Sequence, residues 1–119
     1  MAKSLIGSVT DTTWSDAVGK ADGLTLVLFG AAWCGPCEQI RVNVEVIAKQ
    51  NAGVVNVLYY DVDLTNHRAA SYNVRGVPTL ILFDGENKLA TLTGMQPVAK
   101  IQKGIDSHLS QEVVVANPV

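Results

Sequence analysis

Blocks of apolar and polar positions along the chain predict an α/β domain. Residues 24–29, "LTLVLF", form an apolar, β-favouring run too short for a helix, which indicates a strand buried on both faces. The apolar residues then change to helical spacing at Ile40, Val44 and Ile47, and turn residues at 51–53 end this helix. A second buried strand begins at Val54. This strand–helix–strand order predicts a right-handed crossover between two parallel strands.

The flanking segments continue the mixed pattern. The sequence predicts a short helix or irregular link at 64–72, a strand at 79–83, a hairpin turn at 84–87 and a partner strand at 88–93. A closing helix is indicated by one apolar face, which carries Val98, Ile101, Ile105 and Leu109. Upstream, we expect an edge strand at 4–9 and a short helix at 11–20, with an Asp or a Thr at its N-cap.

Composition narrows the classes of function. With 119 residues, 48% of them hydrophobic, the chain is long enough for one domain with its own core. A net charge of −2 and no basic stripe argue against nucleic-acid binding. The longest apolar run, from Leu26 to Cys34, is too short to span a membrane, and the first ten residues do not resemble a signal peptide. We therefore expect a cytoplasmic protein, in a compartment where structural disulfides are rare.

Both cysteines of the chain lie in one stretch, "WCGPC" at 33–37, which raises three hypotheses. A zinc or iron–sulfur half-site would need further ligands, and the only other candidates, His67 and His108, lie far apart in sequence, so no metal is expected. A structural staple across two residues would close too small a loop to stabilise the fold much. A redox-active pair is therefore the favoured hypothesis.

The predicted elements place the motif where a thiolate is stabilised. Cys34 follows a central strand and precedes a helix, and open α/β sheets carry their chemistry at the carboxyl ends of strands. A helix start offers unpaired N–H groups and the positive end of the helix dipole, both of which favour an anion. We therefore expect Cys34 to ionise at lower pH than a free thiol, and the thiolate is the species that attacks a disulfide. Pro36 is tolerated in the first helical turn.

The motif between that strand and that helix, together with "RGVPT" at 75–79 before the next strand, resembles the thioredoxin family. The resemblance covers roughly residues 4–109. It implies the thioredoxin fold, an α/β architecture with a central mixed β-sheet of about five strands flanked by about four helices. We expect this domain to span 1–110. For the tail at 111–119, disorder, an added strand at Val113–Val115 and a partner contact remain open.

The resemblance also implies roles for individual residues. Cys34 would be the nucleophile and Cys37 the resolving thiol, with Gly35 and Pro36 tuning the redox potential. Pro78 would be a cis-proline facing the cysteines, and Val77 would offer its backbone to an extended substrate segment. An apolar docking surface would surround the sulfurs, made of Trp33, Gly76, Val77, Pro78, Gly94 and Met95.

Four positions depart from the family's pattern. The buried aspartate that usually accepts the proton of the resolving thiol is Leu28, and its usual lysine partner is Tyr59. The basic residue that commonly follows the motif is Glu38, and the proline that kinks the family's helix is Val42, so we expect a straighter helix. The departures at Leu28 and Tyr59 leave open what activates Cys37.

The resemblance implies a thiol–disulfide oxidoreductase that reduces protein disulfides through a mixed disulfide. It would be a monomer without a bound cofactor, recharged by an NADPH-dependent thioredoxin reductase. The alternative is a non-catalytic subunit that clamps a partner enzyme with the apolar surface around the motif.

Overall fold

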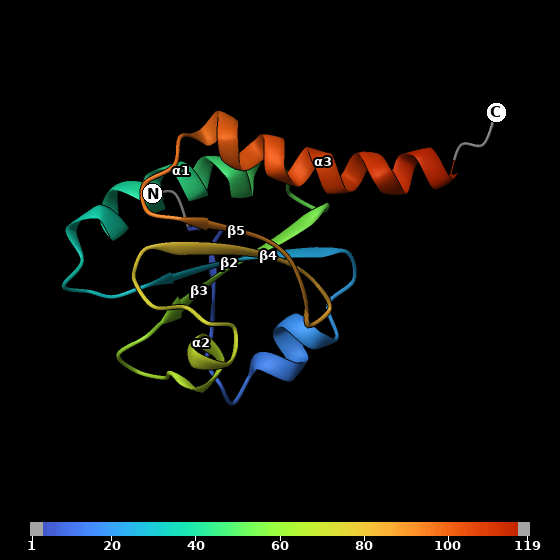
Figure 1. Ribbon diagram of the computed structural model, residues 1–119. Helices are drawn as coiled ribbons and strands as arrows, with labels where there is room; N and C mark the ends of the chain where they lie inside the picture. The colour runs from blue at the N-terminus through green and yellow to red at the C-terminus, as the bar shows by residue number, and fades with distance from the viewer. Residues whose placement is uncertain (1–3, 117–119) are drawn as a thin grey trace.

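The computed structural model describes the backbone of residues 4–116 and the side chains of residues 4–109. Within this range the chain forms one five-stranded mixed sheet in the order β1-β3-β2-β4-β5 (Figure 1). The strands are β1 (Gly7–Val9), β2 (Leu24–Gly30), β3 (Val55–Asp61), β4 (Thr79–Asp84) and β5 (Asn87–Thr93). Strands β1, β3 and β2 are parallel, whereas β4 and β5 run antiparallel to their neighbours. The predicted parallel pair and the predicted hairpin are therefore confirmed.

Four helices of the described range cover the sheet. They are the π-helix η1 (Ser15–Gly19) and the α-helices α1 (Gly35–Gln50), α2 (His67–Ser71) and α3 (Val98–Ala116). Helices α1 and α3 lie on one side of the sheet, and α2 lies on the other side (Figure 1). The expected fold, a mixed sheet of about five strands with about four helices, is confirmed.

The two faces of β2 build two separate cores, because successive side chains of a strand point to opposite faces. Leu24, Leu26 and Leu28 pack under α1 and α3 against a cluster of aliphatic side chains that includes Ile40, Val44, Ile47, Ile101 and Ile105. Val27 and Phe29 point to the other face, where an aromatic cluster forms from Trp14, Phe29, Tyr60, Tyr72 and Phe83. Burial of β2 on both faces agrees with its uninterrupted apolar sequence.

The N-terminal short helix corrects the sequence prediction. It is a π-helix that starts after Trp14, and no side chain caps it, so neither an Asp nor a Thr is its N-cap. The Asp11 carboxylate instead accepts hydrogen bonds from the backbone N–H groups of His67 and Arg68, at the start of α2, and from the Tyr60 hydroxyl. Asp11 therefore stabilises the start of a helix that lies more than fifty residues away in sequence.

The C-terminal helix is longer than its predicted apolar face. Helix α3 continues through Ala116, so the segment Val113–Val115 is helical and the added strand is wrong. Residues 117–119 of the expected tail lie outside the described residues. Residues 4–6 of the expected edge strand precede β1, which is short and pairs only with β3.

Candidate active site

The WCGPC motif joins the end of β2 to the start of α1. Cys34 is the N-cap residue of α1, with an extended backbone conformation, and Pro36 lies in the first helical turn. The Cys34 sulfur accepts a hydrogen bond from the backbone N–H of Cys37, at 3.1 Å. A hydrogen bond of this kind, at the positive end of a helix, stabilises the thiolate form of a cysteine over the thiol form.

Cys34 and Cys37 form a disulfide, with their Cα atoms 5.2 Å apart. Only 4% of each cysteine is exposed. Ala31 is buried with them, and the partly buried side chains of Val62 and Val77 pack against this small cluster. Trp33, by contrast, has 70% of its surface exposed, next to the buried sulfurs. The site therefore combines a protected disulfide with a large apolar side chain available for contact.

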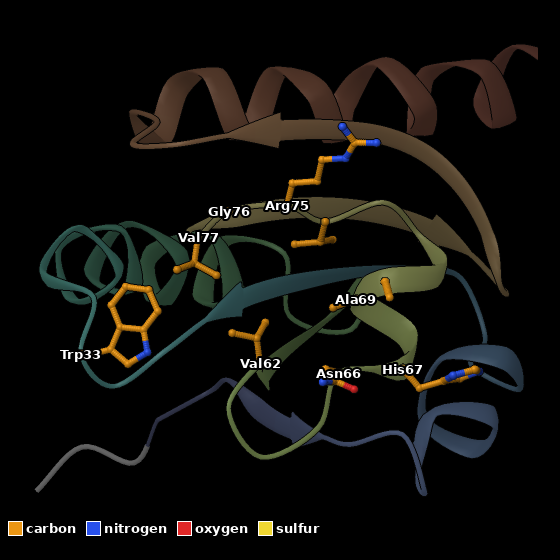
Figure 2. A pocket seen from close by; sticks show the side chains of 10 residues that line it. Trp33, Val62, Asn66, His67, Ala69, Arg75, Gly76 and Val77 are labelled. Carbon is orange, nitrogen blue, oxygen red and sulfur yellow. The ribbon is translucent and has the colours of Figure 1, made fainter.

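A cavity of about 450 Å³ opens beside the disulfide. Figure 2 shows the side chains of Trp33, Val62 and Val77 at one end and those of Asn66 and His67 at the start of α2. Gly76 and Val77 also line a neighbouring cavity of about 380 Å³, together with Pro78 and Gly94. The two cavities are thus both lined by the loop before β4.

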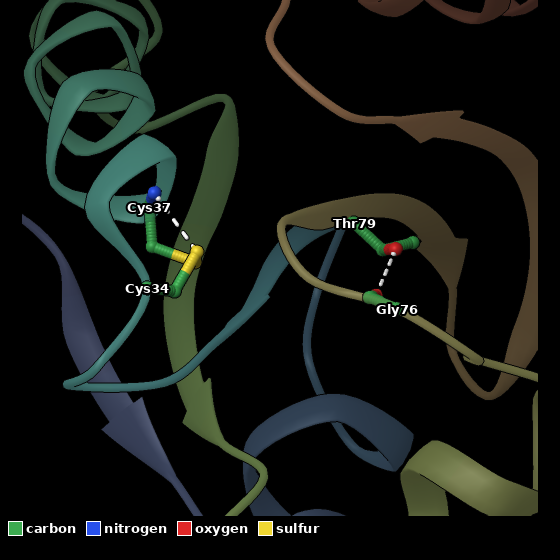
Figure 3. Close-up of a disulfide and its surroundings, with 4 residues drawn as sticks. All are labelled: Cys34, Cys37, Gly76 and Thr79. Carbon is green, nitrogen blue, oxygen red and sulfur yellow. Dashed lines mark hydrogen bonds between the residues drawn. A yellow bond between two sulfur atoms is a disulfide. The ribbon is translucent and has the colours of Figure 1, made fainter.

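Hydrogen bonds hold the loop before β4, in which the Val77–Pro78 peptide bond is cis, and Figure 3 shows the bond between Thr79 and Gly76. The Thr79 hydroxyl donates a hydrogen bond to the Gly76 carbonyl at 2.7 Å, and the Gly94 N–H donates one to the Pro78 carbonyl at 2.9 Å. Gly94 has a φ of +75°, a left-handed conformation that glycine adopts without strain. The loop that faces the cysteines is therefore bonded within itself and to the segment after β5.

The structure brings most of the expected docking residues together. Trp33, Gly76 and Val77 share the first cavity, and Pro78 and Gly94 join them through the second. Met95 lines neither cavity, but it follows Gly94 directly and is 47% exposed. Gly35 lies in the first turn of α1 with no atom in contact range of its missing side chain.

Leu28 and Tyr59 are neighbours in the sheet. They are register partners on the parallel strands β2 and β3, and both belong to the core beneath α1. Leu28 is fully buried, whereas Tyr59 is only partly buried. Burial raises the pKa of Tyr59. The charge of Asp61 also raises this pKa, whereas the charge of Arg41 lowers it. The Arg41 guanidinium lies over the Tyr59 ring, 4.9 Å from its centroid.

Two site residues were not predicted from the sequence. Val62 packs against the cysteines, but only the position of β3 beside β2 places it there. Gly30 ends β2 and leaves open a space that Tyr59 and Cys37 border. A glycine at the end of a buried strand is the one sequence signal that could have identified this close approach.

Within the described residues, no group of three or more His, Cys, Asp or Glu side chains is arranged to hold a metal ion. Among the helices of the same range, none has the length and apolar character needed to cross a membrane.

Comparison with known proteins assigns the chain to a family. The family model described as thioredoxin matches residues 6–107. This chain belongs to the thioredoxin family. It is 34% identical to thioredoxin 1 of Nostoc sp. over 89% of this chain and 99% of that protein. Thioredoxin of Staphylococcus saprophyticus is 36% identical, over 87% of this chain and 98% of that protein.

Solved structures agree with this assignment. A mutant thioredoxin from Halobacterium salinarum NRC-1 superposes with a TM-score of 0.77 at 33% identity, covering 90% of this chain and 94% of that one. The family and the CxxC disulfide make this chain a thiol–disulfide oxidoreductase of the protein-disulfide reductase type. They do not favour the alternative of a non-catalytic clamp.

Proposed function

We propose that Cys34 is the nucleophile of this thioredoxin and Cys37 its resolving thiol. The Cys34 thiolate attacks one sulfur of a substrate disulfide, which gives a mixed disulfide and releases the other substrate sulfur as a thiolate. Cys37 then loses its proton and attacks the Cys34 sulfur, which restores the intramolecular disulfide and releases the reduced substrate. The observation that supports this order of attack is the position of Cys34 as the N-cap of α1, where its sulfur accepts a hydrogen bond from the Cys37 N–H.

The substrate would bind over the apolar surface around the disulfide. Trp33 supplies exposed area, and the cavity between Trp33, Val62 and Val77 can accept a side chain next to the scissile disulfide. The backbone of Val77 would pair with an extended substrate segment. Support for this arrangement comes from the loop at 76–79, whose internal hydrogen bond keeps its backbone in a fixed position.

We further propose a monomer that works in the cytoplasm, with no bound cofactor. Its disulfide would be reduced by a flavin-dependent thioredoxin reductase that uses NADPH, and Gly35 and Pro36 would set the potential. Residues 1–110 would suffice for this activity, because the described site lies between β2 and the segment after β5.

Capture of the mixed disulfide tests the assignment of the two cysteines. Wild type, Cys34→Ser and Cys37→Ser are each reduced and mixed with insulin. Cys37→Ser should accumulate a mixed disulfide between Cys34 and insulin, Cys34→Ser should accumulate none, and only wild type should turn over. A mixed disulfide trapped on Cys37 in the Cys34→Ser protein, with none in Cys37→Ser, would contradict the proposed order.

A further inference from the structure

The Tyr59 hydroxyl and the Cys37 sulfur border the same small space. A Cβ atom placed on Gly30 would lie 3.2 Å from the Tyr59 hydroxyl oxygen and 3.3 Å from the Cys37 sulfur. The Tyr59 oxygen and the Cys37 sulfur are therefore separated by no more than the sum of these two distances. The same Cβ would lie only 2.9 Å from a carbon of the Tyr59 ring. Any larger residue at position 30 would thus displace the ring or the sulfur, and glycine permits their approach.

Tyr59 is partly exposed and borders the same small space as the buried Cys37 sulfur. Cys37 is 4% exposed, so a charge on its sulfur would be poorly hydrated. Tyr59 is partly buried, which leaves part of its side chain in contact with water. Its register partner Leu28 is fully buried and has an aliphatic side chain, so this side chain can offer no hydrogen bond to Cys37.

The charges near Tyr59 come from two elements. Glu38 and Arg41 face it from α1, and Asp61 and Asp63 lie at and after the end of β3. The Tyr59 pKa is raised from its ordinary value, mainly by burial. The phenol therefore remains protonated at neutral pH, when it can donate a hydrogen bond but cannot act as the base that removes the Cys37 proton.

We propose that the Tyr59 hydroxyl donates a hydrogen bond to the Cys37 thiolate during resolution of the mixed disulfide. This inference rests on the proposed role of Cys37 as the resolving thiol. The Cys37 proton passes to water, and the phenol keeps its own proton. The thiolate then forms a bond with the Cys34 sulfur, the bond between Cys34 and the substrate breaks, and the substrate sulfur leaves as a thiolate. The Cys34–Cys37 pair is oxidised by two electrons, and the substrate disulfide is reduced by the same two.

A two-phase thiol assay measures this step separately from the first. Reduced protein is mixed with equimolar 5,5′-dithiobis(2-nitrobenzoic acid) in a stopped-flow instrument. Attack by Cys34 releases the first thionitrobenzoate, and attack by Cys37 on the mixed disulfide releases the second. Tyr59→Phe should raise the pH midpoint of the second phase by about half a unit to one unit, and slow it about three- to tenfold at pH 7, because a hydrogen bond to the charged form is lost. The first phase should be unchanged.

Tyr60→Phe is the matched control. Tyr60 is the next residue of β3, and its hydroxyl faces the other side of the sheet, where it donates to Asp11. This variant should lower the melting temperature without moving the midpoint of the second phase. An unchanged midpoint in a folded Tyr59→Phe protein would overturn the inference. A wild type that releases no second thionitrobenzoate would instead contradict the role of Cys37 itself.

A second variant keeps the test valid if Tyr59→Phe does not fold. Replacement of Tyr59 by 3-fluorotyrosine preserves the ring and makes the hydroxyl a more acidic, stronger donor. Below the pH at which this phenol ionises, the midpoint of the second phase should fall, which is opposite to the effect of Tyr59→Phe. A rise or no change in that midpoint would overturn the inference, because a purely structural role of Tyr59 predicts no fall.

Discussion

Leu28 and Tyr59 lie side by side in the sheet, as register partners on β2 and β3. At these two positions the resemblance to the family implies a buried aspartate and its lysine partner. Leu28 is fully buried, and Tyr59 reaches from the same core toward Cys37. An aliphatic side chain and a phenol thus occupy the two sheet positions where the resemblance implies a carboxylate and an ammonium group. Each of the two departures can be tested separately.

Leu28→Asp should destabilise the protein at neutral pH. The new carboxylate would be buried among the aliphatic side chains of the core beneath α1, and such a charge costs roughly 2–4 kcal/mol. Burial raises the pKa of such an aspartate in the folded state above its unfolded value of about 4. The penalty should therefore be small at pH 4, grow as the pH rises through the unfolded value, and level off above the folded value. Denaturant titrations at pH 4 and pH 8 measure the difference.

The same variant should release the mixed disulfide faster near neutral pH, because it supplies a base for the Cys37 proton. Resolution rates from the two-phase thiol assay measure this gain. Equal stability of Leu28→Asp and wild type at pH 8 would show that position 28 is not a dry site. Loss of stability without faster resolution would show that Cys37 already has an adequate proton path.

Glu38→Lys should make Cys34 react at lower pH. Glu38 lies in the first turn of α1, four residues after Cys34, so its carboxylate disfavours the nearby thiolate. The pH midpoint of iodoacetamide alkylation should fall by a few tenths of a unit, roughly, because exposed charges are well screened. Raising the salt concentration should reduce the difference between the two proteins. A midpoint that is unchanged or higher in Glu38→Lys would refute this account.

Asp11→Asn should lower stability at pH 7 but much less in acid. Burial alone would raise the pKa of Asp11, but hydrogen bonds from Thr65, Tyr60 and the N–H groups of Arg68 and His67 hold it far below its usual range. A carboxylate with a lowered folded pKa stabilises the fold fully above its unfolded pKa of about 4, and loses this effect progressively as the pH falls from that value through the folded pKa. We expect a loss of about 1–2 kcal/mol at pH 7, allowing for the partial exposure of the site.

Thermal melts at pH 7 and pH 2.5 compare Asp11→Asn with wild type. Asp16→Asn is the control, because Asp16 pairs with Lys20 and both side chains are highly exposed. The control should change the melting temperature little at either pH. A difference between Asp11→Asn and wild type that is as large at pH 2.5 as at pH 7 would contradict the prediction.

Gly94→Ala and Gly104→Ala should change stability in opposite directions. Gly94 has a left-handed φ, so an alanine there would be strained by about 1 kcal/mol, although its Cβ would meet no other atom. Gly104 lies within α3 in ordinary helical geometry, again with open space around it, and alanine should stabilise the helix by up to about 1 kcal/mol. The urea midpoints for unfolding of the two variants measure both changes. A shift of the two midpoints in the same direction would contradict the prediction.

The sequence predicts those secondary-structure elements that depend on the local pattern of residues. The apolar run of β2, the helical spacing of α1 and the turn before β5 each follow from residues that are close in sequence, and all three are found. The place of the CxxC motif in the fold could be predicted from these elements, because the motif lies in the sequence between the strand and the helix.

Contacts between distant segments could not be predicted in this way. The sequence predicts an Asp or a Thr as the N-cap of the helix at 11–20, yet the Asp11 carboxylate binds the start of α2, because folding brings that segment beside it. Gly30 does not stand out as a single residue, and Tyr59 stands out in the sequence only as a departure from the family's pattern. Their relation to Cys37 exists only because β2 and β3 pair in one register, which a single sequence does not specify.

The reduction potential of the Cys34–Cys37 couple tests the central claim most directly. Equilibration of the protein with glutathione or dithiothreitol buffers of known potential gives this value. A general reductant of protein disulfides should show a potential near that of thioredoxin, about −270 mV, whereas a strong oxidant such as DsbA lies near −120 mV. A value close to −270 mV is the predicted result, and a value near −120 mV would contradict the assignment as a protein-disulfide reductase.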